Sequence, residues 1–209
     1  MNSFPITVMM VDDHAVVRAG YKRYIELDPL LKVIAEAGTG EEAYSFLESK
    51  HVDVVIMDLS MPGQGGVETL RRMKTRFPLQ KILICTMDES ASMAHHTMKL
   101  GASGYLCKSM APDLMVQAIH EVVSGGTPIS KTVTEGLKKQ GENDLPHMDF
   151  LPREFEIFIY LANGENIEQI CDKLHISQKT AANYQSVIRK KLNASSSLDI
   201  HLYAKKHGL

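Results

Sequence analysis

Acidic side chains directly follow two apolar runs in the first 60 residues. Asp12 and Asp13 follow the run 6–11, and Asp58 follows the run 53–57. A continuous apolar run of this length is typical of a strand buried on both faces of a parallel sheet. In α/β folds, functional sites lie at the carboxyl edge of such a sheet. We therefore expect the three carboxylates to meet at one edge.

Two later strand ends carry a hydroxyl and an amine. Thr86 ends the run 81–86, and Lys108 follows the short run 104–107. Clustered carboxylates repel one another unless a cation compensates them, and oxygen ligands suit Mg²⁺. A carboxylate beside Mg²⁺ can attack phosphorus, while a lysine and a threonine hold the phosphoryl oxygens. The chemistry that this set indicates is formation of an aspartyl phosphate at Asp58.

Each of these residues also has an ordinary structural explanation. Either aspartate of the first pair could cap the helix that begins near residue 14, and Thr86 could be a β-branched strand residue. Lys108 could be a solvated surface lysine. None of these explanations accounts for the whole set at the ends of four different strands, so we favour the chemical interpretation.

The first half of the chain alternates apolar strands with amphipathic helical stretches. Five β–α units with short loops predict a doubly wound, flavodoxin-like α/β fold with a five-stranded parallel sheet. The expected strands are 6–11, 32–37, 53–57, 81–86 and 104–107, and the expected helices are about 14–27, 41–50, 66–77, 91–100 and 112–124.

The pattern changes after residue 125. Glycine, proline and polar residues predict a linker over 126–148, within which 129–140 fits a short helix. The last 60 residues show no strand signal and predict a small all-α domain. Its expected helices are about 152–163, 166–174, 177–192 and 195–206. The turn 175–177 between two of them favours a helix-turn-helix.

The expected helix 178–192 has two different sides. The apolar side, which should pack on the preceding helix, contains Ala181, Tyr184, Gln185, Ile188 and Leu192. The opposite side is small, polar and basic, and contains Lys179, Ala182, Asn183, Ser186 and Lys190. Such a side suits a helix in the DNA major groove. The alternative is the solvated face of a helical protein-binding module.

The composition of the 209 residues limits the broad class of protein. A formal net charge of −2 gives no general basic field for nucleic acid. Cys85, Cys107 and Cys171 lie in apolar runs without metal-ligand spacing, and the pair 95–96 is expected to be exposed helix histidines. No apolar run is long enough to span a membrane, and no signal peptide is evident. We expect a cytoplasmic protein without membrane partners.

Residues 1 to about 125 resemble the receiver domain of response regulators. The resemblance rests on the residues discussed above and on four short stretches: 61–63 (Met-Pro-Gly), 101–102 (Gly-Ala), 104–105 (Gly-Tyr) and the aspartate pair. Residues 150–209 resemble the LuxR-type helix-turn-helix of the NarL/FixJ family. The matching positions are Thr180, Tyr184, Ile188 and Lys191-Leu192, and the last stretch resembles most the branch that contains GacA and UvrY.

The resemblance implies roles for the receiver residues. Asp13 would ligate Mg²⁺ directly, Asp12 would act through water, and Asp58 and the backbone carbonyl of Ser60 would complete the metal site. Thr86 would bond the phosphoryl group, and Tyr105 would be the aromatic switch, although by itself it could be a half-buried strand residue. The receiver would catalyse only its own phosphorylation and dephosphorylation.

The resemblance also implies partners. These are a sensor histidine kinase, promoter DNA, RNA polymerase and a second copy of the chain, bound through about 195–206. Thr180 and Tyr184 join the DNA-contacting set. Ala181 and Ala182 depart from the family pattern, since branched aliphatic and basic or polar residues are usual there. The implied domains are a receiver over 1–125, a linker over 126–148 and a DNA-binding domain over 149–209.

Two rival functions come from other classes of protein. An aspartyl-phosphate phosphatase or phosphotransferase would need a second catalytic carboxylate near Asp58, but the residue two positions on is Ser60, and the chain has no room for a cap domain. A receiver-controlled protein-interaction module would have lost DNA binding. Ala182 and the thin positive charge keep this second rival open.

Overall fold

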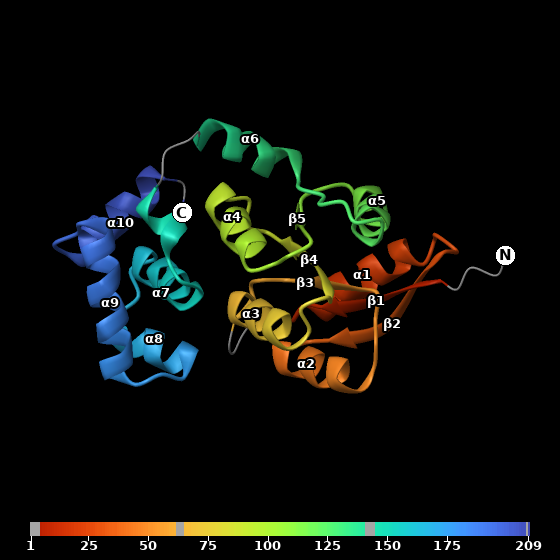
Figure 1. Cartoon of the computed structure of the whole chain (residues 1–209), viewed down its shortest axis with the longest axis horizontal. Coiled ribbons are helices and arrows are strands. Elements are labelled where there is room, and N and C mark those ends of the chain that lie inside the picture. Colours follow the sequence, from red (N-terminus) through yellow and green to blue (C-terminus); the bar gives the residue numbers. More distant parts are fainter. Residues whose placement is uncertain (1–4, 62–64, 141–144, 208) are drawn as a thin grey trace.

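The computed structural model describes residues 5–61, 65–140, 145–207 and 209. They form an α/β unit followed by a smaller helical unit, which lies against one side of it (Figure 1). Within the described part of the chain, no helix is both long and apolar enough to cross a membrane.

The α/β unit is built on a five-stranded parallel sheet of order β2-β1-β3-β4-β5. The strands are β1 (Ile6–Val11), β2 (Leu31–Ala37), β3 (Val54–Met57), β4 (Lys81–Thr86) and β5 (Gly104–Cys107). All four residues of the central strand β3 are buried, as its continuous apolar sequence predicts. The doubly wound fold is confirmed, and each strand lies within one residue of its expected bounds.

Helices cover both faces of the sheet (Figure 1). Val8 and Met10 belong to the apolar cluster under α1 (Ala15–Ile25) and α5 (Pro112–Val123). Met9 and Val11 belong to the other cluster, under α2 (Gly40–Ser49), α3 (Gly66–Arg76) and α4 (Ala91–Lys99). This alternation is the period of two of a β-strand, and it gives the sheet two buried faces.

The segment after α5 is more structured than a plain linker. Ile129 pairs in parallel with Tyr105, so the segment extends the sheet beyond β5. Ser130 strengthens this contact, because its Oγ accepts the backbone N–H of Cys107 at 2.9 Å. The helix α6 (Lys131–Gln140) then packs on α4, and a 3-10 helix, η1 (Pro146–Asp149), leads into the helical unit. The short helix expected within 129–140 is therefore confirmed.

The helical unit consists of α7 (Pro152–Ala162), α8 (Ile167–Leu174), α9 (Gln178–Leu192) and α10 (Ser197–Lys206). The turn between α8 and α9 depends on His175, which is left-handed at φ 50°, and on Ser177, whose Oγ accepts the Thr180 N–H at 3.1 Å. Phe155, Ile170 and Ile188 are fully buried in the core of this unit. The expected helix-turn-helix is present.

Two buried histidines join the helical unit to α4. His147 of η1 is fully buried, with Nε2 2.9 Å from Ser92 Oγ on α4 and Nδ1 2.8 Å from the Tyr203 hydroxyl on α10. His96 stacks on Phe155 of α7, with ring centroids 4.3 Å apart. The expectation of exposed histidines at 95–96 is therefore wrong for His96, which is 3% exposed. Packing by α7, which the local sequence does not reveal, buries it.

Burial makes this interface sensitive to pH. It lowers the pKa of both His96 and His147 from 6.5 to about 4. The nearby charged or titratable groups are His95 and Lys99 for His96, and His207 and His95 for His147. Burial acts in the opposite direction on Glu156 of α7, whose pKa is raised from 4.5 to about 7 although Arg153 favours the charged form.

These shifts predict that the packing of the two units weakens in mild acid. The packed state binds fewer protons on two histidines, so its stability falls as pH drops from 6.5 toward 4. Glu156 opposes this, because its packed state holds a proton below pH 7. The two histidines outweigh the single carboxyl group, so the equilibrium constant for packing of the two units should fall roughly tenfold between pH 7 and pH 5.

Hydrogen-exchange protection factors of the amides in η1 and the first turns of α7 measure this equilibrium, and those in α5 serve as the internal reference. His96→Phe keeps the stack on Phe155 but removes one titrating group, so the acid-induced loss should nearly vanish. Equal protection of the wild-type amides at the two pH values would contradict the prediction.

Candidate functional site

Two buried carboxylates share one ammonium at the carboxyl edge of the sheet. Asp12 follows β1, Asp58 follows β3, and each is 3% exposed. Lys108 follows β5 and places its Nζ 2.6 Å from Asp12 Oδ2 and 2.6 Å from Asp58 Oδ2. The structure thus brings together three of the side chains that the sequence places at separate strand ends.

The shared ammonium compensates part of the negative charge. Burial alone would lower the pKa of Lys108, but the hydrogen bonds to Asp12 and Asp58 outweigh it and hold that pKa above its usual value. Lys108 therefore stays charged. With Asp13 included, three carboxylates still face one ammonium, so the site suits a further cation.

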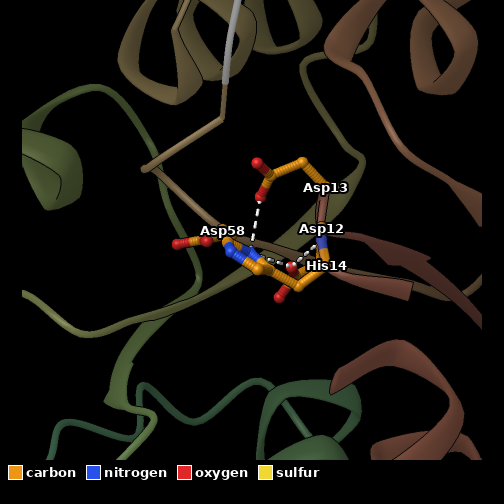
Figure 2. Close-up of side chains that lie close together, drawn as sticks. All are labelled: Asp12, Asp13, His14 and Asp58. Carbon is orange, nitrogen blue, oxygen red and sulfur yellow. Dashed lines mark hydrogen bonds and ion pairs between the residues drawn. The ribbon is translucent and has the colours of Figure 1, made fainter. Parts of the chain in front are cut away.

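Asp13 lies on the open side of the cluster. Its carboxylate is partly exposed and lies 2.8 Å from Nδ1 of His14, which is also 3.4 Å from Asp12 Oδ1 (Figure 2). One ligand atom from each of Asp12, Asp13, His14 and Asp58 fits within a mutual distance of 4.8 Å. Such a set can hold a divalent cation through oxygen ligands.

Sequence reasoning missed His14 and Arg18 as members of the site. His14 donates its backbone N–H to Asp12 Oδ1 at 2.8 Å, and Arg18, one helical turn on, donates to the Asp12 backbone carbonyl. Both follow the aspartate pair at the start of α1, which is the local signal that could have identified them. Together they fix the Asp12 side chain and backbone.

The loop after Asp58 is shaped by close backbone contacts. The Ser60 N–H donates to Asp58 Oδ1 at 3.2 Å, which orients the carboxylate. Gly65 has φ +76°, and a Cβ at Gly66 would lie 2.3 Å from the Leu59 Cα. Glycine is therefore required where the loop enters α3. The expected match at 61–63 lies outside the described residues except for Met61, which is buried.

Thr86 and Tyr105 both contact Asp88, in the loop that follows β4. Thr86 is fully buried, and its Oγ1 accepts the Asp88 N–H at 3.4 Å. The Tyr105 hydroxyl donates to the Asp88 carbonyl oxygen at 2.8 Å. Tyr105 is fully buried rather than half-buried, and burial raises its pKa above the usual value. The two residues are thus coupled through one loop.

The opposite end of the molecule carries the second candidate surface. Lys179, Ala182, Asn183, Ser186 and Lys190 of α9 are all exposed, whereas Ala181 and Ile188 are buried. Thr180, Tyr184, Gln185 and Leu192 are half-buried. The two predicted sides of this helix are confirmed. Figure 1 shows α9 on the side of the helical unit that faces away from the sheet, so packing of the units leaves it open.

Comparison with known proteins is consistent with both surfaces. The family model described as "Response regulator receiver domain" matches residues 8–120, and the one described as "Bacterial regulatory proteins, luxR family" matches residues 150–204. Response regulator UvrY of Escherichia coli K12 is 34% identical over 98% of this chain and 95% of its own length.

Two further relatives cover nearly the whole chain. Response regulator GacA of Pseudomonas aeruginosa PAO1 is 34% identical over 98% of this chain and 97% of its own. RcsB of Salmonella enterica serovar Typhimurium, solved bound to a promoter with a phosphomimetic, has a TM-score of 0.75 over 96% of this chain and 98% of its own. RcsB is 24% identical, so that likeness concerns the fold.

The shared ammonium predicts that removal of Lys108 leaves two buried carboxylates without compensation. Lys108→Met should lower the free energy of unfolding by roughly 3–5 kcal/mol at pH 7 in chelator-treated buffer. Excess Mg²⁺ should stabilise this variant more than the wild type, because the ion replaces part of the lost charge. Urea unfolding with and without Mg²⁺ measures both effects, with the exposed Lys32→Met as control. An identical Mg²⁺ response in variant and wild type would refute this account.

Proposed function

Because the chain belongs to the NarL/FixJ family of response regulators, with a receiver and a LuxR-type DNA-binding domain, we propose that phosphorylation of Asp58 controls its binding to promoter DNA. The observation that carries this proposal is the buried Asp58 carboxylate at the end of the central strand, bonded to Lys108 and to the Ser60 N–H. Transcription regulation is the main role of the family, so its members are not enzymes in the ordinary sense. In our proposal, the receiver is 1–125, the linker 126–148 and the DNA-binding domain 149–209.

Mg²⁺ is the cation that we propose for the acidic cluster. Asp13 would ligate the ion directly, because its carboxylate is the partly exposed one of the cluster. Asp12 would act through water, and Asp58 and the Ser60 carbonyl would supply the remaining protein oxygens. When bound, Mg²⁺ neutralises charge that develops on the phosphoryl oxygens. In our proposal, the receiver catalyses only its own phosphorylation and dephosphorylation.

Side chains of the receiver carry out the other steps of the reaction. The Asp58 carboxylate attacks phosphorus, the bond from phosphorus to the donor breaks, and the donor leaves with the electron pair. Lys108 already lies 2.6 Å from Asp58 and can follow the charge onto the phosphoryl oxygens. Thr86 bonds the new phosphoryl group. Because Thr86 and Tyr105 share the Asp88 loop, this bond shifts the equilibrium between two receiver conformations.

A sensor histidine kinase is the proposed phosphodonor partner. Response regulators are phosphorylated by such kinases. An apolar groove lies beside the site between α1 and the loops after β4 and β5. Val16 is 86% exposed and Met87 68% exposed at this groove, and Lys108 reaches its edge. Exposed apolar side chains of this kind suit a helical partner that must deliver a phosphoryl group next to Lys108.

Promoter DNA is the proposed target of α9, and RcsB, which has a similar fold, was solved bound to a promoter. Lys179 and Lys190 lie near its two ends and suit phosphates, whereas Asn183 lies between them and suits a base edge. Thr180 and Tyr184 flank this surface. Homodimerisation through α10 would place two copies of α9 on one site, since Leu198 and Leu202 are 62% and 54% exposed. RNA polymerase is the expected partner at the promoter.

The proposal predicts that Asp58 is the phosphorylated residue. Asp58→Asn keeps the shape of the side chain but removes the nucleophilic carboxylate. After treatment with acetyl phosphate and Mg²⁺, intact mass should show an added phosphoryl group on the wild type and none on the variant. Asp53→Asn is the control, because Asp53 lies at the other end of β3, bonded to Thr7. A phosphoryl group on Asp58→Asn would move the reaction to another residue.

The proposal also predicts different roles along α9. Asn183→Ala should relax preference at one base pair at a cost of about 1–3 kcal/mol, because it loses a bidentate base contact. Lys190→Ala should weaken binding to all DNA sequences alike. It should also reduce the slope of the logarithm of the binding constant against the logarithm of salt concentration by about one. Binding to a selected site and to scrambled DNA is measured across a salt series.

The rival protein-interaction module gives a different result in the same experiment. If Asn183→Ala leaves the ratio of specific to scrambled binding unchanged, α9 does not read bases. Ala182, which cannot hydrogen-bond a base, is the feature that favours this rival. Ala182→Lys should raise affinity for any DNA, because it adds a phosphate contact without a base contact.

A further inference from the structure

The DNA-binding domain covers part of the entrance to the phosphoacceptor site. A cavity of about 510 Å³ lies at this entrance, and Asp13, Ser60 and Gly65 form its receiver side. Tyr160 of α7 and Lys173 of α8 form the other side. Two residues of the DNA-binding domain therefore lie beside the path by which a phosphodonor reaches Asp58.

Close packing holds α7 in this place. Glu156 is 8% exposed, and a Cβ added to Gly65 would lie 2.8 Å from its Oε1. A second cavity, of about 170 Å³, lies between the Leu59–Ser60 loop and Phe155. Phe155 also stacks on His96 of α4, so α7 contacts the receiver near Gly65 and at α4. Lys173 of α8 is tied to α7 by its contact with the Tyr160 ring.

Lys173 is anchored but keeps its ammonium accessible. Nζ lies 2.7 Å from Glu165 Oε1 and 5.3 Å from the centroid of the Tyr160 ring. Its side chain is still 53% exposed, and one carboxylate partner leaves further N–H groups for a ligand. The ammonium is thus presented at the wall of the cavity with little freedom to lose on binding.

The entrance carries a net negative charge, which this ammonium can partly offset for an incoming anion. A phosphate-bearing donor is an anion, and it must approach three carboxylates that Lys108 alone does not neutralise. A cation on the approach path lowers the electrostatic barrier for such an anion. Lys173 and Asp13 both line the cavity, so Lys173 can pair with the donor while Lys108, bonded to Asp58, meets the transferring group.

We propose that Lys173 of the DNA-binding domain is part of the binding site for small acyl-phosphate donors of the receiver. The inference rests on the proposed phosphorylation of Asp58. The donor transfers its phosphoryl group to an Asp58 oxygen, its own acyl–oxygen–phosphorus bond breaks at phosphorus, and the carboxylate leaves. Lys173 takes no part in these bond changes. It binds and orients the donor, with Tyr160 supporting its side chain.

The test measures initial rates of phosphorylation of the full-length chain by acetyl phosphate at saturating Mg²⁺. Intact mass gives the phosphorylated fraction over a range of donor concentrations. A single ion pair of about 1 kcal/mol corresponds to roughly a fivefold change in affinity. Lys173→Ala should therefore raise the half-saturating donor concentration about three- to fivefold and leave the maximal rate unchanged. Lys173→Arg should restore the wild-type value.

Glu165→Gln is the matched control. It removes the ion pair that anchors Lys173 but keeps the ammonium near the cavity, so donor affinity should fall less than in Lys173→Ala. If Glu165→Gln reproduces the full effect of Lys173→Ala, the lysine only holds α8 in place, and the proposal is overturned. The same holds if Lys173→Ala leaves the half-saturating concentration unchanged.

Different results would refute phosphorylation of Asp58 and donor binding by Lys173. A wild-type chain that acquires no phosphoryl group would refute the proposed function itself. A wild type that is phosphorylated on Asp58, together with a Lys173→Ala variant of unchanged donor affinity, would refute the donor site alone. Raised salt provides a further check, since it should shrink the difference between wild type and Lys173→Ala.

Discussion

Two carboxylates, Asp12 and Asp58, are buried side by side, and the receiver is organised around their compensation. Lys108 reaches both from the end of β5, and it can do so only because β1, β3 and β5 end at the same edge of one parallel sheet. An uncompensated charge in such a place would cost several kcal/mol. The topology of the sheet, the register of its strands and the short loops after them all serve this arrangement. A phosphoryl group on Asp58, as we propose, would enter the same network and change its charge.

The packing of the two units covers one functional surface of this chain and leaves the other open. The polar side of α9 stays exposed while α7 lies on α3 and stacks on His96 of α4, so this packing does not hide the residues that we propose contact DNA. What it covers is the entrance to the site itself, through Glu156, Tyr160 and Lys173. In our proposal, the helical unit helps to bind the phosphodonor of the receiver, so linkage makes the influence between the two domains reciprocal.

Periodicity in the sequence accounts for most of the fold and much of the site. The strands and helices follow from alternation and helical spacing, and Asp12, Asp58, Thr86 and Lys108 follow from their places at strand ends. His14 and Arg18 were missed because their part in the site depends on the exact start of α1. His96 was placed on the surface because nothing near it in the sequence announces Phe155, which lies 59 positions later. Contacts between units depend on tertiary packing, which local patterns do not encode.

The ring of His147 has a consequence for modularity. Its two nitrogens contact Ser92 in the receiver and Tyr203 near the end of the chain. One side chain of the connecting segment therefore contacts both domains. Receivers and helix-turn-helix domains are often regarded as exchangeable parts. In a chimaera that joined this receiver to a foreign DNA-binding domain, Ser92 would face a surface without its matching ring. Such a fusion would keep the fold of each half but lose the contacts between them. The connecting segment, and not only the two domains, is therefore specific to this protein.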